Sequence, residues 1–196
     1  MGAPRARASL LLAVCLLAAC KAYQMPSGSM EMTILSGDYF IATPSSDDAK
    51  RKEIVVYNRR GQTYVHRVLG LPGDTIAMRN RVVVVNGDSI AEPYAQHFLE
   101  ESRADAAFAW QRRFVPGFGL RRTYAPTLTD WGPIVIPPGQ YFLLGDNRGQ
   151  AADSRYDGFV DRRDIFARPR FIYFSKSRST GEVRWRRIGQ SIADSQ

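Results

Sequence analysis

Cysteine and histidine are scarce in this sequence of 196 residues. The two cysteines, Cys15 and Cys20, lie within the first 20 residues, and the two histidines are His66 and His97. The rest of the chain therefore has neither a disulfide framework nor a cysteine-based metal site. So few imidazoles also argue against a zinc enzyme, and we expect no metal and no cofactor.

A long apolar run is also missing at the N-terminus. The stretch from Leu10 to Ala19 is shorter than the roughly 20 residues that a membrane-spanning helix needs. It follows Arg5 and Arg7, an arrangement typical of an export signal. We therefore assign residues 1–22 to a signal peptide, a lipoprotein signal or a membrane anchor.

Two interpretations of this segment stay open. Leu17-Ala18-Ala19-Cys20 resembles a bacterial lipobox, in which case Cys20 is a candidate for lipidation and becomes the mature N-terminus. Alternatively, the segment is an uncleaved anchor with Lys21 and Tyr23 at the membrane interface. Both predict a domain on the outer, extracytoplasmic face of a bacterial cell membrane.

Acidic residues are outnumbered, with 19 of them against 27 lysines and arginines and a formal net charge of +8. Such an excess suits an anionic partner, either lipid head groups or nucleic acid. The arginines are scattered, and no nucleic-acid-binding motif accompanies them. We expect contact with a membrane lipid surface and no nucleic acid. A β domain that only binds lipid or an anionic polymer would rest on the charge alone, and it is the least favoured interpretation.

After Tyr23 the chain lacks a sustained helical period and is instead typical of a mostly β domain. Short strands separated by turn residues are predicted at 39–42, 53–57, 63–69, 81–85, 134–136, 141–144 and 170–174. Asn86-Gly87 predicts a tight hairpin, because both turn positions need a positive φ. We expect one β domain over residues 23–196, with an excursion from its core at about 91–131.

Three segments stand out by their order along the chain. They are Met25-Pro26-Ser27-Gly28-Ser29-Met30, Tyr64 to Asp74 (YVHRVLGLPGD), and Gly145-Asp146-Asn147-Arg148 followed by Ala152-Asp153-Ser154-Arg155. Together they resemble the sequence boxes of the bacterial type I signal peptidases, peptidase family S26. The resemblance covers residues 23–90 and 131–174 and implies an antiparallel β fold of the signal peptidase type, preceded by a short hydrophobic segment.

The resemblance also implies roles for particular residues. Ser29 matches the nucleophile, and Ser27 matches the residue whose hydroxyl joins the Ser29 amide in holding the oxyanion. The apolar walls of the substrate pockets are matched by Met25, Met30, Ile34, Val56 and Val65. Substrates would be exported preproteins whose signal peptides end in an Ala-X-Ala-like sequence.

The general base departs from the bacterial pattern, because His66 stands where lysine is expected. Imidazole titrates near neutral pH and can accept the serine proton directly, so the replacement is chemically competent. The endoplasmic-reticulum branch of the family is similar in using serine and histidine. Ala151 stands where bacterial members carry a serine that supports the lysine. Because this chain has no lysine to orient, it does not need that serine.

A histidine base benefits from a carboxylate on its other ring nitrogen. Asp153 is the candidate for this support, with Asp146 and Asp157 as weaker alternatives. The resemblance, however, implies that Asp153 pairs with Arg67, the residue after the base.

The residues therefore predict a membrane-associated serine endopeptidase that uses a Ser29/His66 dyad. The alternative is a catalytically degenerate domain of the same family, in which His66 is merely a buried histidine and the module binds extended peptides along a strand edge.

Overall fold

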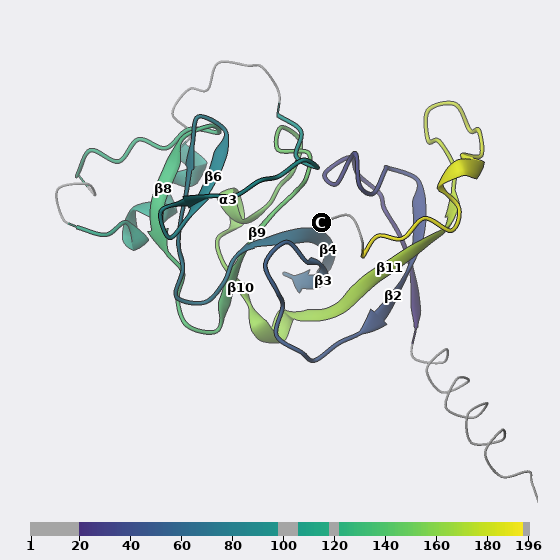
Figure 1. Ribbon diagram of the computed structural model, residues 1–196, viewed down its shortest axis with the longest axis horizontal. Coiled ribbons are helices and arrows are strands. Elements are labelled where there is room, and N and C mark those ends of the chain that lie inside the picture. Colours follow the sequence, from purple (N-terminus) through teal and green to yellow (C-terminus); the bar gives the residue numbers. More distant parts are fainter. Residues whose placement is uncertain (1–19, 98–105, 118–121, 194–196) are drawn as a thin grey trace, which may run out of the picture.

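The computed structural model describes residues 20–97, 106–117 and 122–193. They form a mostly antiparallel β structure of two sheets (Figure 1). The larger sheet has the order β1-β2-β11-β3-β4-β9-β10 and the smaller sheet the order β7-β6-β5-β8. No helix in the described part of the chain is long and apolar enough to cross a membrane.

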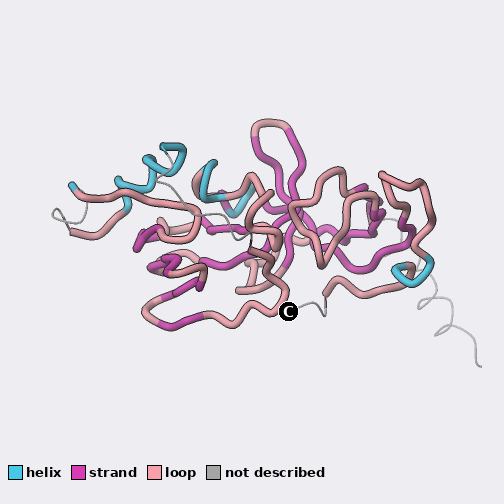
Figure 2. The backbone as a smooth tube through the Cα atoms, turned by 90° about the horizontal axis from the view of Figure 1, so that it is seen from above, coloured by secondary structure: helices cyan, strands magenta, loops and turns pink. Residues whose placement is uncertain are grey.

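The strands of the larger sheet are β1 (Lys21–Gln24), β2 (Asp38–Pro44), β3 (Ile54–Arg59), β4 (Gln62–Gly70), β9 (Gln140–Leu144), β10 (Val160–Asp161) and β11 (Ile165–Ser175). Those of the smaller sheet are β5 (Thr75–Arg79), β6 (Val82–Val85), β7 (Asp88–Ser89) and β8 (Trp131–Val135). The helices are short: η1 (Ala106–Phe114), α3 (Ser154–Asp157), η2 (Arg162–Asp164) and η3 (Trp185–Arg187). Each packs against a strand, η1 against β8, α3 against β9, η2 against β3 and η3 against β11, and Figure 2 shows them as short pieces among the strands and loops.

Strand β3 shows why the larger sheet can bury both of its faces. Its first four residues are apolar or aromatic, and all four are buried. Because side chains alternate along a strand, Ile54 and Val56 pack in one apolar cluster and Val55 and Tyr57 in another. Each such side chain contributes about 1.5 to 3 kcal/mol by leaving water.

The two sheets are joined twice, through β4 to β5 and through β8 to β9. A shared apolar cluster lies between them, with Leu69 and Phe142 from the larger sheet and Ile76 and Trp131 from the smaller. Figure 1 shows β6 and β8 on one side, β2 and β11 on the other, and β4 and β9 between them. Of the two loops described below, one follows the central strand β9 and the other follows the edge strand β1.

The seven predicted strands are confirmed, with bounds shifted by a few residues. The Asn86-Gly87 hairpin is confirmed as well, since φ is 54° and 96° at these two residues between β6 and β7. Strand β5, the edge strand β1 and the two-residue strands β7 and β10 were not predicted. In the segment 91–131, the described part packs Val115 and Phe114 against the cluster between the sheets. The proposed domain boundaries stay predictions.

Candidate active site

The loop after β1 holds the two serines of the first box. Its two ends are joined, because the Met25 amide donates to the Asp38 carbonyl at 2.8 Å, and the Ile34 amide donates to the Met30 carbonyl at 2.8 Å within it. Within it, the Ser27 hydroxyl donates to Ser29 Oγ at 3.2 Å. Ser29 is 8% exposed, so its hydroxyl is held in a mostly buried position beside a second hydroxyl.

A second loop, which follows β9, docks against the Ser29 backbone. The Asn147 amide donates to the Ser29 carbonyl at 3.0 Å. Gly145 makes this approach possible, because a Cβ there would lie 2.6 Å from the Ser29 carbonyl oxygen and 2.2 Å from the Ala151 Cβ. The same point is 3.5 Å from His66 Cδ2, so the Ser29 backbone and the imidazole border one small volume.

His66 lies on β4 and is 2% exposed. Its Nδ1 shares a hydrogen bond of 2.8 Å with the Tyr57 hydroxyl. Burial lowers the pKa of His66 below its ordinary value, since a charged imidazolium is poorly solvated there, although the negative charges of Asp153 and Asp146 oppose the shift. The ring is therefore neutral at neutral pH, the state in which it can accept a proton.

Ser29 and His66 line the same cavity, of about 380 Å³. Its walls come from the end of β1 and the loop after it, from residues 62–66 of β4, and from Gln150 and Ala152 in the loop after β9. The pairing of β4 with β9 begins at Arg67, so no strand of the described chain pairs with residues 62–66 on that side. A nucleophile candidate, a base candidate and a free strand edge thus meet in one cavity.

The comparisons with known proteins agree with this arrangement. The family model described as signal peptidase, peptidase S26, matches residues 5–174. Signal peptidase I of Bacillus caldolyticus is 33% identical over 83% of this chain and 87% of its own length. Signal peptidase I of Bacillus amyloliquefaciens is 35% identical over 65% of this chain, and the match spans 60% of that relative.

The chain belongs to the signal peptidase family, peptidase S26. A solved signal peptidase I of Enterococcus faecalis is 32% identical, with a TM-score of 0.41, over 62% of this chain and 96% of that structure. Signal peptidases of this family are serine endopeptidases, and the comparisons favour this activity over a degenerate binding module.

Within this family member, Arg67 ties the three boxes together instead of pairing with Asp153. Arg67 Nε and Nη2 donate to the two oxygens of Asp146 at 2.8 and 2.7 Å, and neither side chain is exposed. Asp146 also accepts from Thr33 Oγ1 at 2.5 Å. The guanidinium lies 3.7 Å from the centre of the Tyr94 ring. Arg67 therefore links β4 to the loops that carry Ser29 and Asn147.

The expected carboxylate partner of His66 is not at its ring nitrogen. Asp153 instead caps helix α3 and binds Arg155, with Arg155 Nε at 2.8 Å and Nη2 at 2.9 Å, and it also accepts from the Gly145 amide at 3.0 Å. Burial favours a raised pKa for Asp153, but the Arg155 charge and these hydrogen bonds lower it overall. Asp153 thus acts on His66 through its charge, while Tyr57 makes the hydrogen bond.

The residues assigned to substrate pockets fall into two groups. Met25 and Val65 line the cavity. Met30, Ile34 and Val56 are fully buried and do not line it, but they belong to the same apolar cluster as Met25 and Val65. Cys20 is partly exposed at the start of the described residues, directly before β1.

His97 belongs to a different cavity, which it shares with Arg81, Arg148 and Arg155. Burial and these arginines lower the pKa of His97 to about 4. His97 is half-buried. It does not line the cavity that holds Ser29.

Proposed function

We propose that this chain removes signal peptides from exported preproteins with Ser29 as the nucleophile and His66 as the general base. The supporting observation is that both side chains border one cavity in a member of the signal peptidase family. The two side chains share no direct hydrogen bond in the structure. Catalytic hydrogen bonds often shorten only when substrate is bound.

The chemistry follows from the two side chains. His66 Nε2 takes the proton of the Ser29 hydroxyl while Ser29 Oγ attacks the scissile carbonyl carbon. The resulting oxyanion is held by the Ser29 amide and the Ser27 hydroxyl, which lies beside Oγ at 3.2 Å. The imidazolium then returns its proton to the leaving amine, and water hydrolyses the acyl-enzyme by the same route.

The substrate would bind as an extended strand along residues 62–66 of β4. Main-chain hydrogen bonds to a free strand edge provide affinity, and the pockets between them select side chains. Met25 and Val65, which line the cavity, would form the walls of pockets for small residues at the first and third positions before the cut, in keeping with Ala-X-Ala-like ends.

Cleavage of a purified preprotein tests this proposal, with the product identified by mass spectrometry. A preprotein ending its signal in Ala-X-Ala is expected to be cut after the second alanine. Leucine in place of that alanine is expected to slow cleavage about 100-fold or more, because the added atoms do not fit a pocket for small side chains. Equal cleavage of the two preproteins would contradict the proposed pocket.

The acidic limb of the rate profile provides a second test. Since burial lowers the pKa of His66, the imidazole stays unprotonated until the pH falls below its ordinary value of about 6.5. We expect kcat/KM to be constant through neutral pH and to fall only in this acidic range. A limb above about pH 8 would indicate an amine-like base instead. His97→Gln is the control, because it should leave the limb unmoved.

We further propose that the domain works on the outer face of the cell membrane, held there by the segment that precedes Lys21. The basic net charge of +8 supports contact with anionic lipid. Lipidated Cys20 and an uncleaved anchor differ in the mass of the mature N-terminus, which distinguishes them.

A further inference from the structure

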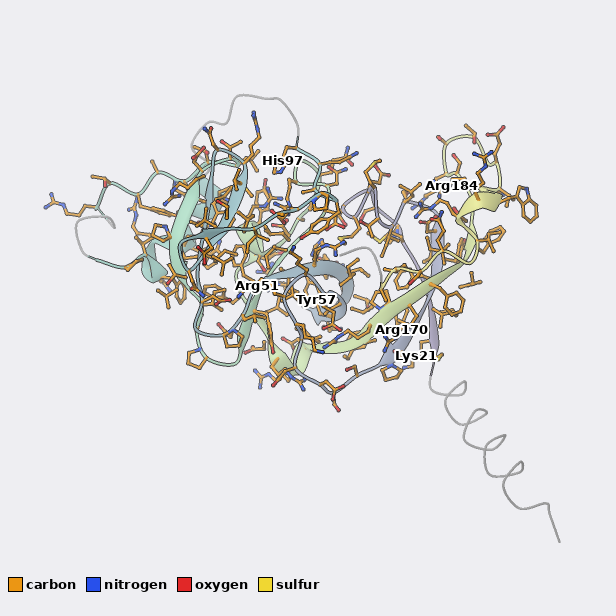
Figure 3. The ribbon with its side chains drawn as sticks, viewed as in Figure 1. Lys21, Arg51, Tyr57, His97, Arg170 and Arg184 are labelled. Atoms are coloured by element: carbon orange, nitrogen blue, oxygen red, sulfur yellow. The ribbon has the colours of Figure 1, made fainter. Side chains whose placement is uncertain are left out.

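Tyr57 occupies the place at His66 where a carboxylate was expected. Its hydroxyl lies 2.8 Å from His66 Nδ1, and both side chains are 2% exposed. Among the described residues this is the only hydrogen bond of the Tyr57 hydroxyl. In Figure 3, Tyr57 lies centrally, by β3 and β4, while His97, the other histidine, lies toward the periphery.

The register of the sheet fixes this contact. Strand β3 pairs with β4 so that Tyr57 faces Tyr64 and Val55 faces His66. Side chains two residues apart on one strand share a face, so Tyr57 and His66 are diagonal neighbours within reach of an aromatic side chain. Their rings are 5.8 Å apart, and Tyr57 also stacks on Tyr64 at 5.6 Å. The phenol is thus held by the sheet itself and not by a loop.

The hydrogen bond has two directions with opposite consequences for catalysis. If the phenol donates to Nδ1, the neutral ring carries its proton on Nε2 and has no lone pair for Ser29. If Nδ1–H donates to the phenol oxygen, Nε2 is the free lone pair. Once the ring is protonated, both nitrogens are donors, and the bond can run in the second direction alone.

We propose that Tyr57 is the positioning residue of the base: its oxygen accepts from Nδ1–H, which keeps Nε2 unprotonated for the Ser29 hydroxyl. This inference rests on the proposed role of His66. The phenol does what a carboxylate does in other serine hydrolases, but without a negative charge. Burial raises the pKa of Tyr57 well above its usual value, so the hydroxyl stays neutral throughout the working range.

The charged groups around the ring are consistent with a neutral partner. Asp153, Asp146 and Asp157 favour protonation of His66, and Arg155 disfavours it. Asp153 and Asp146, however, are bound to Arg155 and Arg67. The imidazolium that forms during the reaction therefore depends on the phenol oxygen for its direct hydrogen bond.

Nitrogen NMR of the full chain, labelled with ¹⁵N, reads the tautomer directly. The sequence has only two histidines, so two imidazole patterns appear, and His97→Gln assigns them. The expected result at neutral pH is a protonated Nδ1 and an unprotonated Nε2 for His66 in the unmodified chain. The reverse pattern, with the proton on Nε2, would overturn the proposal without any need for a variant at Tyr57.

Kinetics of Tyr57→Phe provide the second measurement. We expect kcat to fall about 10- to 1000-fold, below the roughly 10⁴-fold loss known for a wrong tautomer in a catalytic triad, while KM changes little. The acidic limb should also move to lower pH, because the imidazolium loses its acceptor. Tyr141→Phe is the matched control, since Tyr141 is buried in the same apolar cluster but is not part of the site.

The outcomes separate this inference from the function on which it rests. Cleavage that survives in His66→Ala refutes the dyad itself. Loss of cleavage in His66→Ala, with kcat and the limb unchanged in Tyr57→Phe, refutes the role of Tyr57 alone. A general packing defect would instead lower kcat in Tyr57→Phe and Tyr141→Phe alike without moving the limb, which also contradicts the proposal.

Discussion

Ser29→Ala is expected to reduce preprotein cleavage by about 10⁴-fold or more. The substitution removes the oxygen that attacks the scissile carbonyl, and the remaining groups of such a site support only weak catalysis. Because Ser29 is 8% exposed and loses a single atom, the fold should be preserved. Single-turnover cleavage of a preprotein, followed by gel and mass spectrometry, measures the loss.

Ser179→Ala is the control for this experiment. Ser179 is exposed and makes its hydrogen bond to Ser177, outside the cavity. Its cleavage rate should match that of the unmodified chain. If Ser29→Ala retains more than about a hundredth of the activity, another nucleophile operates and the mechanism is wrong.

Arg67→Met is expected to lower the free energy of unfolding by about 3 to 5 kcal/mol, because it leaves the buried carboxylate of Asp146 without its charged partner. Asp146 is fully buried and would keep Thr33 as its remaining side-chain donor. The variant also loses the hydrogen bond to the Lys52 carbonyl and the contact with Tyr94. Urea unfolding followed by circular dichroism measures the change.

The exposed pair of Arg163 and Asp161 is the matched comparison. Their side chains are 84% and 41% exposed, and such pairs contribute about 0 to 1 kcal/mol. Arg163→Met should therefore leave the unfolding curve almost unchanged. Similar curves for Arg67→Met and Arg163→Met would show that Asp146 is not held by Arg67.

The strands could be predicted because their signals are local. Val82 to Val85 followed by Asn86-Gly87, for example, requires no knowledge of the rest of the chain to predict a strand and a hairpin. Strand β5 was missed because Ala77, Met78 and Arg79 have no strong strand preference, and its pairing with β6 and β8 determines its conformation.

The partner of His66 could not be predicted because it depends on register. The sequence predicted strands that contain Tyr57 and His66, but not that Val55 would lie opposite His66. That pairing follows from the turn at Arg60-Gly61, where both residues have positive φ. Asp153, in contrast, is bound by Arg155 only two residues away, a local contact that the sequence prediction did not take into account.

The unpaired edge of β4 has a consequence for how many preproteins one enzyme can process. Amide and carbonyl groups repeat identically along every polypeptide, so a guest held mainly through them is accepted whatever most of its side chains are. If substrate binds along this edge as proposed, discrimination falls on the few positions whose side chains would enter the cavity that Met25 and Val65 line. Signal peptides of different exported proteins are unrelated in most of their sequence, so an enzyme that processes many of them must accept variation at most positions and require particular residues at only a few.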